Sequence, residues 1–292
     1  MSPAQITEIN AHFQRYNNAP MAAFSGLSPA QMHHLMYDPL GAASPVQLRA
    51  DLPAAVLDQV PLLRLTEELL RLVQREGYIK LTAGGALPRK YLQELYDHGI
   101  LPDEFVEVDS VKINREIDSS FLHITHIVAT AAGLVKKIHG KLTVTKKGQL
   151  LQPPAQRSQL LRLLLEVFTS KFNWGYFDVF GNDESPAGQL AWAYSVYLLA
   201  RFGTEARLMH FYADKYLLAF PFVINSVQEV TYMTREEQIR SYYNGRVFFR
   251  FARWFGLAYI KERKYGPDAE ADQVTATSLV AQLFQVSRGG KA

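Results

Sequence analysis

The sequence contains no cysteine and no long apolar run, and its net charge is small. The absence of Cys among 292 residues excludes a disulfide framework and thiolate metal sites, and it favours a reducing, cytoplasmic location. The most apolar run, residues 216–224, is far shorter than the roughly 20 residues that span a bilayer. The N-terminus lacks the features of a secretion signal, so we expect no membrane partner.

Motifs for catalysis or metal binding are also missing. The glycine runs lack the phosphate-loop and dinucleotide patterns, and no nucleophile elbow or carboxylate pair is evident. His123 and His126 have the i, i+3 spacing that places two imidazoles on one helix face, but no acidic residue stands beside them at a ligand spacing. We therefore expect a binding protein rather than an enzyme, with no cofactor and no metal site.

Helix starts are easy to recognise in this chain. Ser-Pro-x-Gln begins at Ser2, Ser28 and Ser44, where Ser can cap, Pro fits the first turn and Gln can reach back. Ser185-Pro and the capping box at Thr234 predict two further starts. Most of the chain should be helical.

One local pattern occurs at least twice, and faintly a third time: a helix ends at Gly, a strand and a turn follow, and a Thr-containing strand leads into another helix. It occurs at Gly133 with the segment 134–151, and again at Gly256 with the segments 257–261 and 273–284. Upstream of the first copy, apolar periodicity predicts a helix, a strand, and two more helices, the last beginning at Ser119 or Ser120. The predicted order is helix, strand, helix, helix, hairpin.

The segment Leu-Thr-Val-Thr-Lys-Lys-Gly-Gln-Leu-Leu, residues 142–151, resembles the wing strand and following helix of bacterial winged-helix regulators. The resemblance covers residues 60–155 as an order of elements and about ten residues as a motif. It implies a fold more than an activity, because winged helices bind DNA in many families and dock proteins in others. The chain as a whole also resembles uncharacterised bacterial proteins, which supply no catalytic residues to carry over.

These patterns predict a mostly α protein of the α+β class, with two winged-helix-like modules that carry short β-hairpins and are joined by a helical layer. The predicted parts are an N-terminal wrapping segment (1–58), the first module (59–155), the helical layer (156–233) and a second, partial module (234–292).

Nucleic-acid binding by the first module depends on its hairpin, because the predicted third helix has no Arg or Lys with which to read base edges. Acidic residues between 97 and 118 also flank that helix. The hairpin and the turn after it contain five lysines with no acid between them: Lys136, Lys137, Lys141, Lys146 and Lys147. A solvated lysine hairpin without a ligand is the competing interpretation.

The second module carries arginines at helical spacing. Arg246, Arg250 and Arg253 fall at i, i+4 and i+7, which places them on one face of an α-helix. The following hairpin adds Lys261, Arg263 and Lys264. Guanidinium forks and flexible lysines are suited to phosphate contact, whereas pairing with nearby glutamates is the alternative.

Two hypotheses follow. The preferred one is sequence-tolerant binding of DNA or RNA through these basic residues. The other is an interaction scaffold, in which the hairpins and the aromatic segment 172–180 meet a protein partner or a second copy of the chain. Packing of those aromatics in the core would leave them unavailable to a partner.

Overall fold

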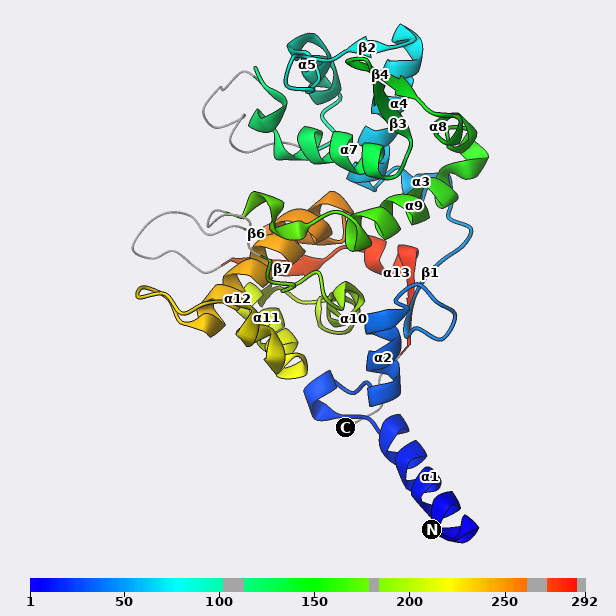
Figure 1. The fold of residues 1–292 in the computed structure, drawn as a ribbon, viewed down its shortest axis with the longest axis vertical. Coiled ribbons are helices and arrows are strands. Elements are labelled where there is room, and N and C mark those ends of the chain that lie inside the picture. The colour runs from blue at the N-terminus through cyan, green and yellow to red at the C-terminus, as the bar shows by residue number, and fades with distance from the viewer. Residues whose placement is uncertain (102–112, 179–183, 262–271, 288–292) are drawn as a thin grey trace. The chain divides into compact units, whose positions relative to one another are not determined.

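The chain forms two compact units, which we describe separately. The computed structural model describes residues 1–101, 113–178, 184–261 and 272–287. Unit 1 comprises residues 1–49, 174–253 and 257–292, and unit 2 comprises residues 50–173 and 254–256. The described chain is mostly helical with small antiparallel sheets, which confirms the predicted fold class (Figure 1). No described helix has the length and apolarity to cross a membrane.

The described elements of unit 2 follow the predicted order of helix, strand, helix, helix and hairpin. Its sheet is antiparallel with β4 in the centre, in the order β2-β4-β3. Helices α4 and α7 pack against each other, and both bury apolar side chains in the core of the unit. The elements are α3 (Ala54–Leu57), α4 (Pro61–Glu76), β2 (Ile79–Lys80), α5 (Arg89–Asp97), η2 (Glu116–Asp118), α7 (Ser120–Ala131), β3 (Val135–Ile138), β4 (Lys141–Val144), α8 (Lys146–Leu151), η3 (Pro154–Gln156) and α9 (Arg157–Ser170).

Unit 1 contains a second three-stranded sheet, in the order β5-β7-β6, and a two-stranded sheet of β1 with β8. Its core is rich in aromatic side chains, with Tyr194, Tyr216, Tyr243 and Phe248 all fully buried. The elements are α1 (Pro3–Asn18), η1 (Ala22–Phe24), α2 (Pro29–Tyr37), β1 (Val46–Leu48), η4 (Trp174–Phe177), α10 (Trp192–Phe202), β5 (Arg207–Leu208), α11 (Met209–Ala219), η5 (Pro221–Ser226), α12 (Arg235–Tyr243), η6 (Asn244–Ala252), β6 (Ala258–Lys261), β7 (Gln273–Ala276), α13 (Leu279–Leu283) and β8 (Phe284–Val286).

The same order of elements occurs in both units. In unit 1 it begins at α10 and continues through β5, α11, α12 with η6, the β6–β7 hairpin and α13. In unit 2, the N–H of Leu134 donates to the end of α7 and its carbonyl accepts from the N–H of Thr145 at 2.9 Å. Leu257 makes the same two bonds in unit 1, accepting from Thr277 at 2.9 Å. The local repeat seen in the sequence is therefore present in the backbone.

Capping boxes form at Ser2, Ser28 and Thr234, and Ser119 caps α7, as predicted. The prediction of a helix after Ser44 is wrong, because Val46–Leu48 pairs with β8 as a strand. At Ser185 the prediction is also wrong. The next α-helix begins only at Trp192, after a left-handed residue, Ala191.

The long α-helix predicted from residue 235 is interrupted. After α12 the chain forms the π-helix η6 (Asn244–Ala252), whose i→i+5 turn is wider than that of an α-helix. On this wider helix Arg246 and Arg250, at i and i+4, still share a side, where both bond to Asp178, whereas the i+7 position is turned away from them. The single arginine stripe predicted for this segment depended on α-helical geometry and is therefore wrong.

The Thr-Lys-Lys-Gly segment has a structural role. Thr145 is the N-cap of α8: its Oγ1 accepts from the N–H of Gly148 at 3.0 Å and donates to the carbonyl of Gly133 at 2.6 Å. A Cβ at Gly148 would lie 2.3 Å from the backbone oxygen of Leu134. Only glycine fits this approach of α8 to the end of α7.

We therefore expect Gly148→Ala to lower the free energy of unfolding by about 1–3 kcal/mol, because the backbone must move to accept the methyl group. Gly84→Ala is the matched control in the same unit, since a Cβ there meets nothing within 4 Å. Urea unfolding followed by circular dichroism measures both. Equal stability of the two variants would contradict this account of the motif.

Candidate nucleic-acid interface

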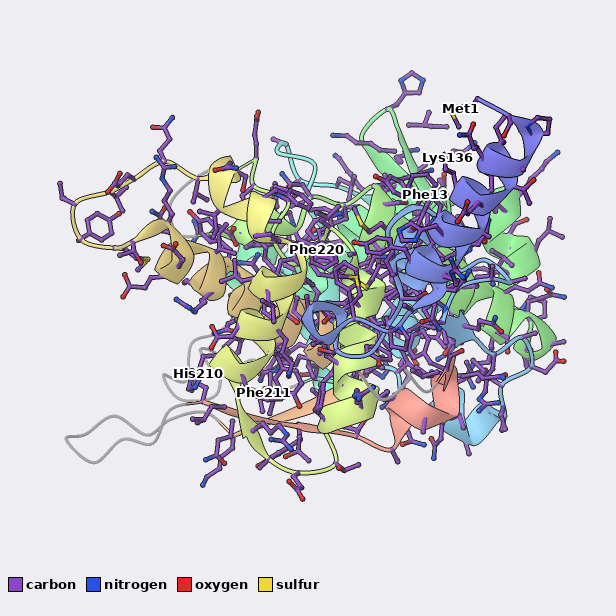
Figure 2. The ribbon with its side chains drawn as sticks, turned by 90° about the horizontal axis from the view of Figure 1, so that it is seen from below. Met1, Phe13, Lys136, His210, Phe211 and Phe220 are labelled. Carbon is purple, nitrogen blue, oxygen red and sulfur yellow. The ribbon has the colours of Figure 1, made fainter. Side chains whose placement is uncertain are left out.

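The solvent-facing side of the sheet in unit 2 is cationic. Lys80 pairs with Lys141 across β2 and β4, and Ile138 pairs with Lys141 across β3 and β4. Directly paired residues share a face of a sheet, and so do residues two apart on one strand. Lys136, two residues before Ile138, therefore lies on the same side. We call the exposed side chains of Lys80, Lys136 and Lys141 the lysine face; Figure 2 labels Lys136.

An aromatic ring is part of this surface. Tyr78 is 48% exposed, and the Nζ of Lys141 lies 4.0 Å from the centroid of its ring. The strands β2, β3 and β4 contain no Asp or Glu, so no carboxylate within them neutralises the lysines. A cationic surface with an exposed aromatic ring can contact both phosphates and bases.

The other predicted lysines of this unit lie at the edges of the sheet. Lys137 is exposed on β3, and Lys146 and Lys147 are exposed in the first turn of α8. The Nζ of Lys147 donates to the carbonyl of Ala132 at 2.9 Å, so this lysine also caps the end of α7. Lys80 and Tyr78 were absent from the prediction, because only the pairing of β2 with β4 places them beside Lys141.

The corresponding sheet of unit 1 has a different surface. By the register of β6 with β7, Tyr259 and Thr275 occupy the places that Lys136 and Thr143 occupy in unit 2. Tyr259 is 67% exposed, and Lys261 is the one cation on this side of the three strands. The two sheets share a topology but not a charge pattern.

Two side chains of the third helix of unit 2, α7, belong to a buried polar cluster. Glu116 is 2% exposed, and its Oε1 lies 3.0 Å from Nδ1 of His123 and 2.9 Å from Nδ1 of His126. Its Oε2 accepts from the N–H of Leu87 at 2.5 Å. Burial by itself raises the pKa of Glu116, but the hydrogen bonds from both histidines and from the Leu87 amide outweigh it and lower the pKa to about 2.

This cluster explains the spacing of the two histidines. Their Nδ1 atoms face a carboxylate that joins η2, α7 and the segment before α5. Within the described residues no group of three or more His, Asp or Glu side chains is arranged to hold a metal ion. The arrangement anchors α7 in the unit.

Arg246 and Arg250 are held inside unit 1. Arg246 is 1% exposed, and its Nε and Nη2 donate to Oδ2 of Asp178 at 2.8 and 2.5 Å. Its Nη1 donates to the carbonyls of Ser185 and Ala187. Arg250 donates to Oδ1 of Asp178 at 2.7 Å and to a backbone carbonyl, and burial lowers its pKa despite Asp178.

The prediction that Arg246 contacts phosphate is therefore wrong, because its guanidinium is enclosed and bonded to protein acceptors. Arg250 is also committed to Asp178, so we omit it from the interface. The alternative to phosphate contact, pairing of these arginines with nearby glutamates, named the wrong partners. The actual partner, Asp178, lies 68 residues from Arg246 along the chain.

The other phosphate contacts predicted in unit 1 are Arg253, Lys261, Arg263 and Lys264. Arg253 is half-buried at the end of η6, and Lys261 is exposed on β6. Arg263 and Lys264 lie outside the described residues. Among the residues described, Arg253 and Lys261 are therefore the two predicted contacts of unit 1 that are not bonded to Asp178.

The aromatic segment is mainly part of the core. Phe172 and Trp174 are 5% and 1% exposed, whereas Tyr176 is 48% exposed. The ring of Trp174 stacks on that of Phe251 with centroids 5.1 Å apart. Phe180 lies outside the described residues. This segment therefore offers one exposed ring and no continuous aromatic surface among the residues described.

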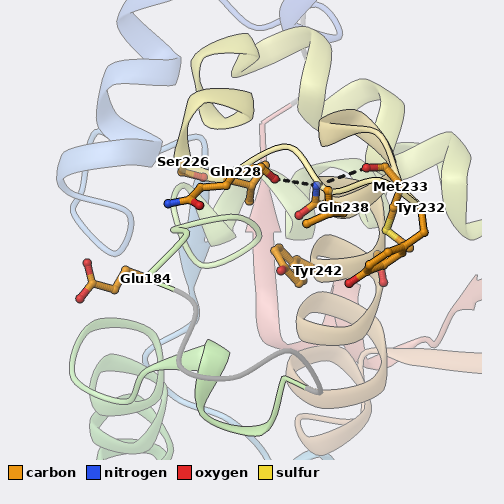
Figure 3. Close-up of a pocket in the computed structure, with 10 residues that line it drawn as sticks. Glu184, Ser226, Gln228, Tyr232, Met233, Gln238 and Tyr242 are labelled. Atoms are coloured by element: carbon orange, nitrogen blue, oxygen red, sulfur yellow. Dashed lines mark hydrogen bonds between the residues drawn. The ribbon is translucent and has the colours of Figure 1, made fainter.

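Unit 1 also contains a polar cleft of about 510 Å³ (Figure 3). Its walls include Gln228, Tyr232 and Met233, and Gln238 donates through Nε2 to the carbonyl of Gln228 at 2.9 Å. The described lining contains one carboxylate, Glu184, and no cation or histidine. This described lining therefore offers phosphate no cation.

A family model described as the Y4jL N-terminal domain matches residues 58–159. The matched part is less than half of the chain and includes α4 through α8, the elements that carry the lysine face. The description states no activity or ligand. No curated protein and no solved structure matches the sequence.

We expect Glu116→Gln to lower the free energy of unfolding at pH 7 by about 2 kcal/mol, because it removes a charge held by several hydrogen bonds. The pKa of Glu116 in the folded protein, about 2, lies below its ordinary value of 4.5. Its ionised form therefore stabilises the fold above about pH 4.5, and this contribution disappears as the pH falls towards 2. In the Glu116→Gln variant, the free energy of unfolding should not show this fall between about pH 4.5 and pH 2.

Urea unfolding between pH 7 and pH 2.5 measures the effect. Glu94→Gln is the control, since Glu94 pairs with the exposed Arg75 and should change stability by less than about 1 kcal/mol. A Glu116→Gln variant that keeps the wild-type pH profile would contradict the assignment.

We expect Asp178→Asn to lower the free energy of unfolding by about 3–5 kcal/mol, because it leaves two enclosed guanidiniums without a counter-charge. Asp214→Asn is the matched control: its pair with Arg240 is 2.7 Å long but half exposed, and the expected change is about 0–1 kcal/mol. Guanidinium chloride unfolding compares them. Similar losses in the two variants would show that Asp178 does not support unit 1 in this way.

Proposed function

We propose that this protein is a nucleic-acid-binding protein that acts in the cytoplasm without catalysis, and that its contact surface is the lysine face of a winged-helix-like module in unit 2. The observation that carries this proposal is the alignment of Lys80, Lys136 and Lys141 on one side of a sheet whose strands contain no carboxylate. Winged-helix-like topology is supported by the order of elements and by the position of the hairpin beside α7.

The chemistry of the surface favours contact with the sugar-phosphate backbone. Lysine is a flexible point charge and carries little base specificity. Helix α7 presents no Arg or Lys, and its two histidines are bonded to Glu116. Binding is therefore tolerant of sequence and dominated by counterion release, which makes it weaken steeply as salt rises.

A second candidate function is supported by α1. None of its residues is buried, and Ile6, Ile9, Phe13 and Tyr16 are 41–57% exposed at i, i+3, i+7 and i+10 spacing. Figure 2 labels Phe13 on this helix. The spacing is that of a coiled-coil seam, which favours an interaction scaffold. An assembly formed through this stripe would persist at high salt, unlike binding through the lysine face.

We expect the double variant Lys136→Glu with Lys141→Glu to weaken binding to labelled duplex and single-stranded DNA and RNA by at least about tenfold at 50 mM salt. Each lost phosphate contact should reduce the slope of log affinity against log salt by about one. Fluorescence anisotropy from 50 to 200 mM salt measures both quantities.

Lys171→Glu is the matched control, because Lys171 is an exposed lysine of the same unit at the end of α9. It should bind nearly as well as the wild type, and circular dichroism should show that all variants are folded. Wild-type binding that is insensitive to salt, or no binding at 50 mM salt, would refute the proposal.

A further inference from the structure

A cleft of about 580 Å³ in unit 1 has two arginines and no Asp or Glu among the described residues that line it. It lies where the β1–β8 sheet adjoins α10 and α13. Arg49 directly follows β1, and its N–H donates to the carbonyl of Leu283 at 2.9 Å. Arg201 comes from the last turn of α10. We call this cleft the arginine cleft.

Buried groups position one of these arginines. The Nη1 of Arg201 donates to the hydroxyl of Tyr197 at 2.8 Å, and that hydroxyl donates to the carbonyl of Ser25 at 2.8 Å. Tyr197 is only 1% exposed. This relay fixes one edge of the guanidinium, so that less side-chain freedom is lost when the other edge binds a ligand.

Neither guanidinium forms an ion pair with a carboxylate in the part of the chain that the structure describes. Arg246, Arg250 and Arg157 differ in this respect, since each is paired with Asp or Glu. Two arginines that face one cleft without a counter-charge repel each other, and a bound anion removes that repulsion. A dianion matches the charge of the pair better than a monoanion does.

The remaining walls indicate the rest of the ligand. Phe284, Val286 and Ala281 contribute apolar surface, and Gln285 and Ser287 contribute polar groups. The volume is in the range of small-molecule sites. Guanidinium forks bind phosphate oxygens with two parallel hydrogen bonds, and a phosphate monoester carries a charge of about −1.5 to −2 at neutral pH.

We propose that the arginine cleft binds a small phosphate monoester that carries an apolar or aromatic group. Arg49 and Arg201 hold the phosphate, Tyr197 positions Arg201, and the accessible side chains of Ala281 and Val286 contact the apolar group. The cleft lies in unit 1 and shares no residue with the lysine face, so this inference does not depend on nucleic-acid binding.

Isothermal titration calorimetry of the full chain with phenyl phosphate tests the proposal, with inorganic phosphate and benzoate as comparison ligands. We expect saturable one-to-one binding of phenyl phosphate, weaker binding of inorganic phosphate, and the weakest binding of benzoate. Arg49→Ala and Arg201→Ala should each reduce the affinity for phenyl phosphate by at least about tenfold, as expected for the loss of a charge-assisted contact.

Arg240→Ala is the matched control, because it removes a half-exposed arginine of the same unit that pairs with Asp214 outside the cleft. Arg201→Lys keeps the charge without the fork and should give an intermediate affinity. The double variant Lys136→Glu with Lys141→Glu should bind phenyl phosphate normally, which separates this site from the lysine face. Circular dichroism verifies folding.

Three results would overturn the inference. They are no binding of phenyl phosphate by the wild type, equal losses in Arg240→Ala and the cleft variants, and benzoate binding as tight as that of phenyl phosphate. The last result would assign the cleft to carboxylates instead of phosphate monoesters.

Discussion

In each unit, one backbone hydrogen bond closes the β-hairpin of the three-stranded sheet. It joins the residue that follows the helix before the hairpin to the threonine that precedes the helix after it. The carbonyl of Leu134 accepts from Thr145, and the carbonyl of Leu257 accepts from Thr277, both at 2.9 Å. This hydrogen bond requires the preceding helix to end abruptly, and Gly133 and Gly256 supply this with φ of +70°. Because a left-handed residue is easily tolerated only at glycine, the position of the hairpin follows from the position of that glycine.

With the hairpin in place, the chemistry of each unit depends on where its cations lie. In unit 2 the lysines occupy the outer side of the sheet, where their charges remain hydrated and available. In unit 1 the arginines of η6 turn inward to Asp178 and the carbonyls of Ser185 and Ala187. Removal of these charges from water is costly unless each is paired and hydrogen-bonded, so this cluster holds Asp178, Ser185 and Ala187 against the π-helix.

The two proposed sites use cations in different ways. The lysine face is open and flexible, and suits a long polyanion that is recognised by charge density. The arginine cleft is concave and partly preorganised by Tyr197, and suits a compact ligand held by directed hydrogen bonds. Glu116 has a third kind of role, since its buried charge fixes His123 and His126 and keeps them in a structural cluster.

The sequence alone determined the helical content, the capped helix starts at Ser2, Ser28 and Thr234, and the repeated hairpin pattern. These features depend on neighbours a few residues apart, so local periodicity and capping chemistry reveal them. The exposure of Lys136 and Lys141 could also be predicted from the sequence, because a hydrated lysine in a hairpin needs no distant partner.

Only the tertiary structure decided which of the remaining charges are buried and which surfaces they share. Asp178 captures Arg246 and Arg250 across 68 and 72 residues, and β1 pairs with β8 from the opposite end of the chain. Lys80 joins Lys141 through strand pairing, and the arginine cleft combines residues from around positions 49, 200 and 285. Such contacts depend on long-range packing and on the free energy of burying charge, for which a local sequence pattern carries no signal.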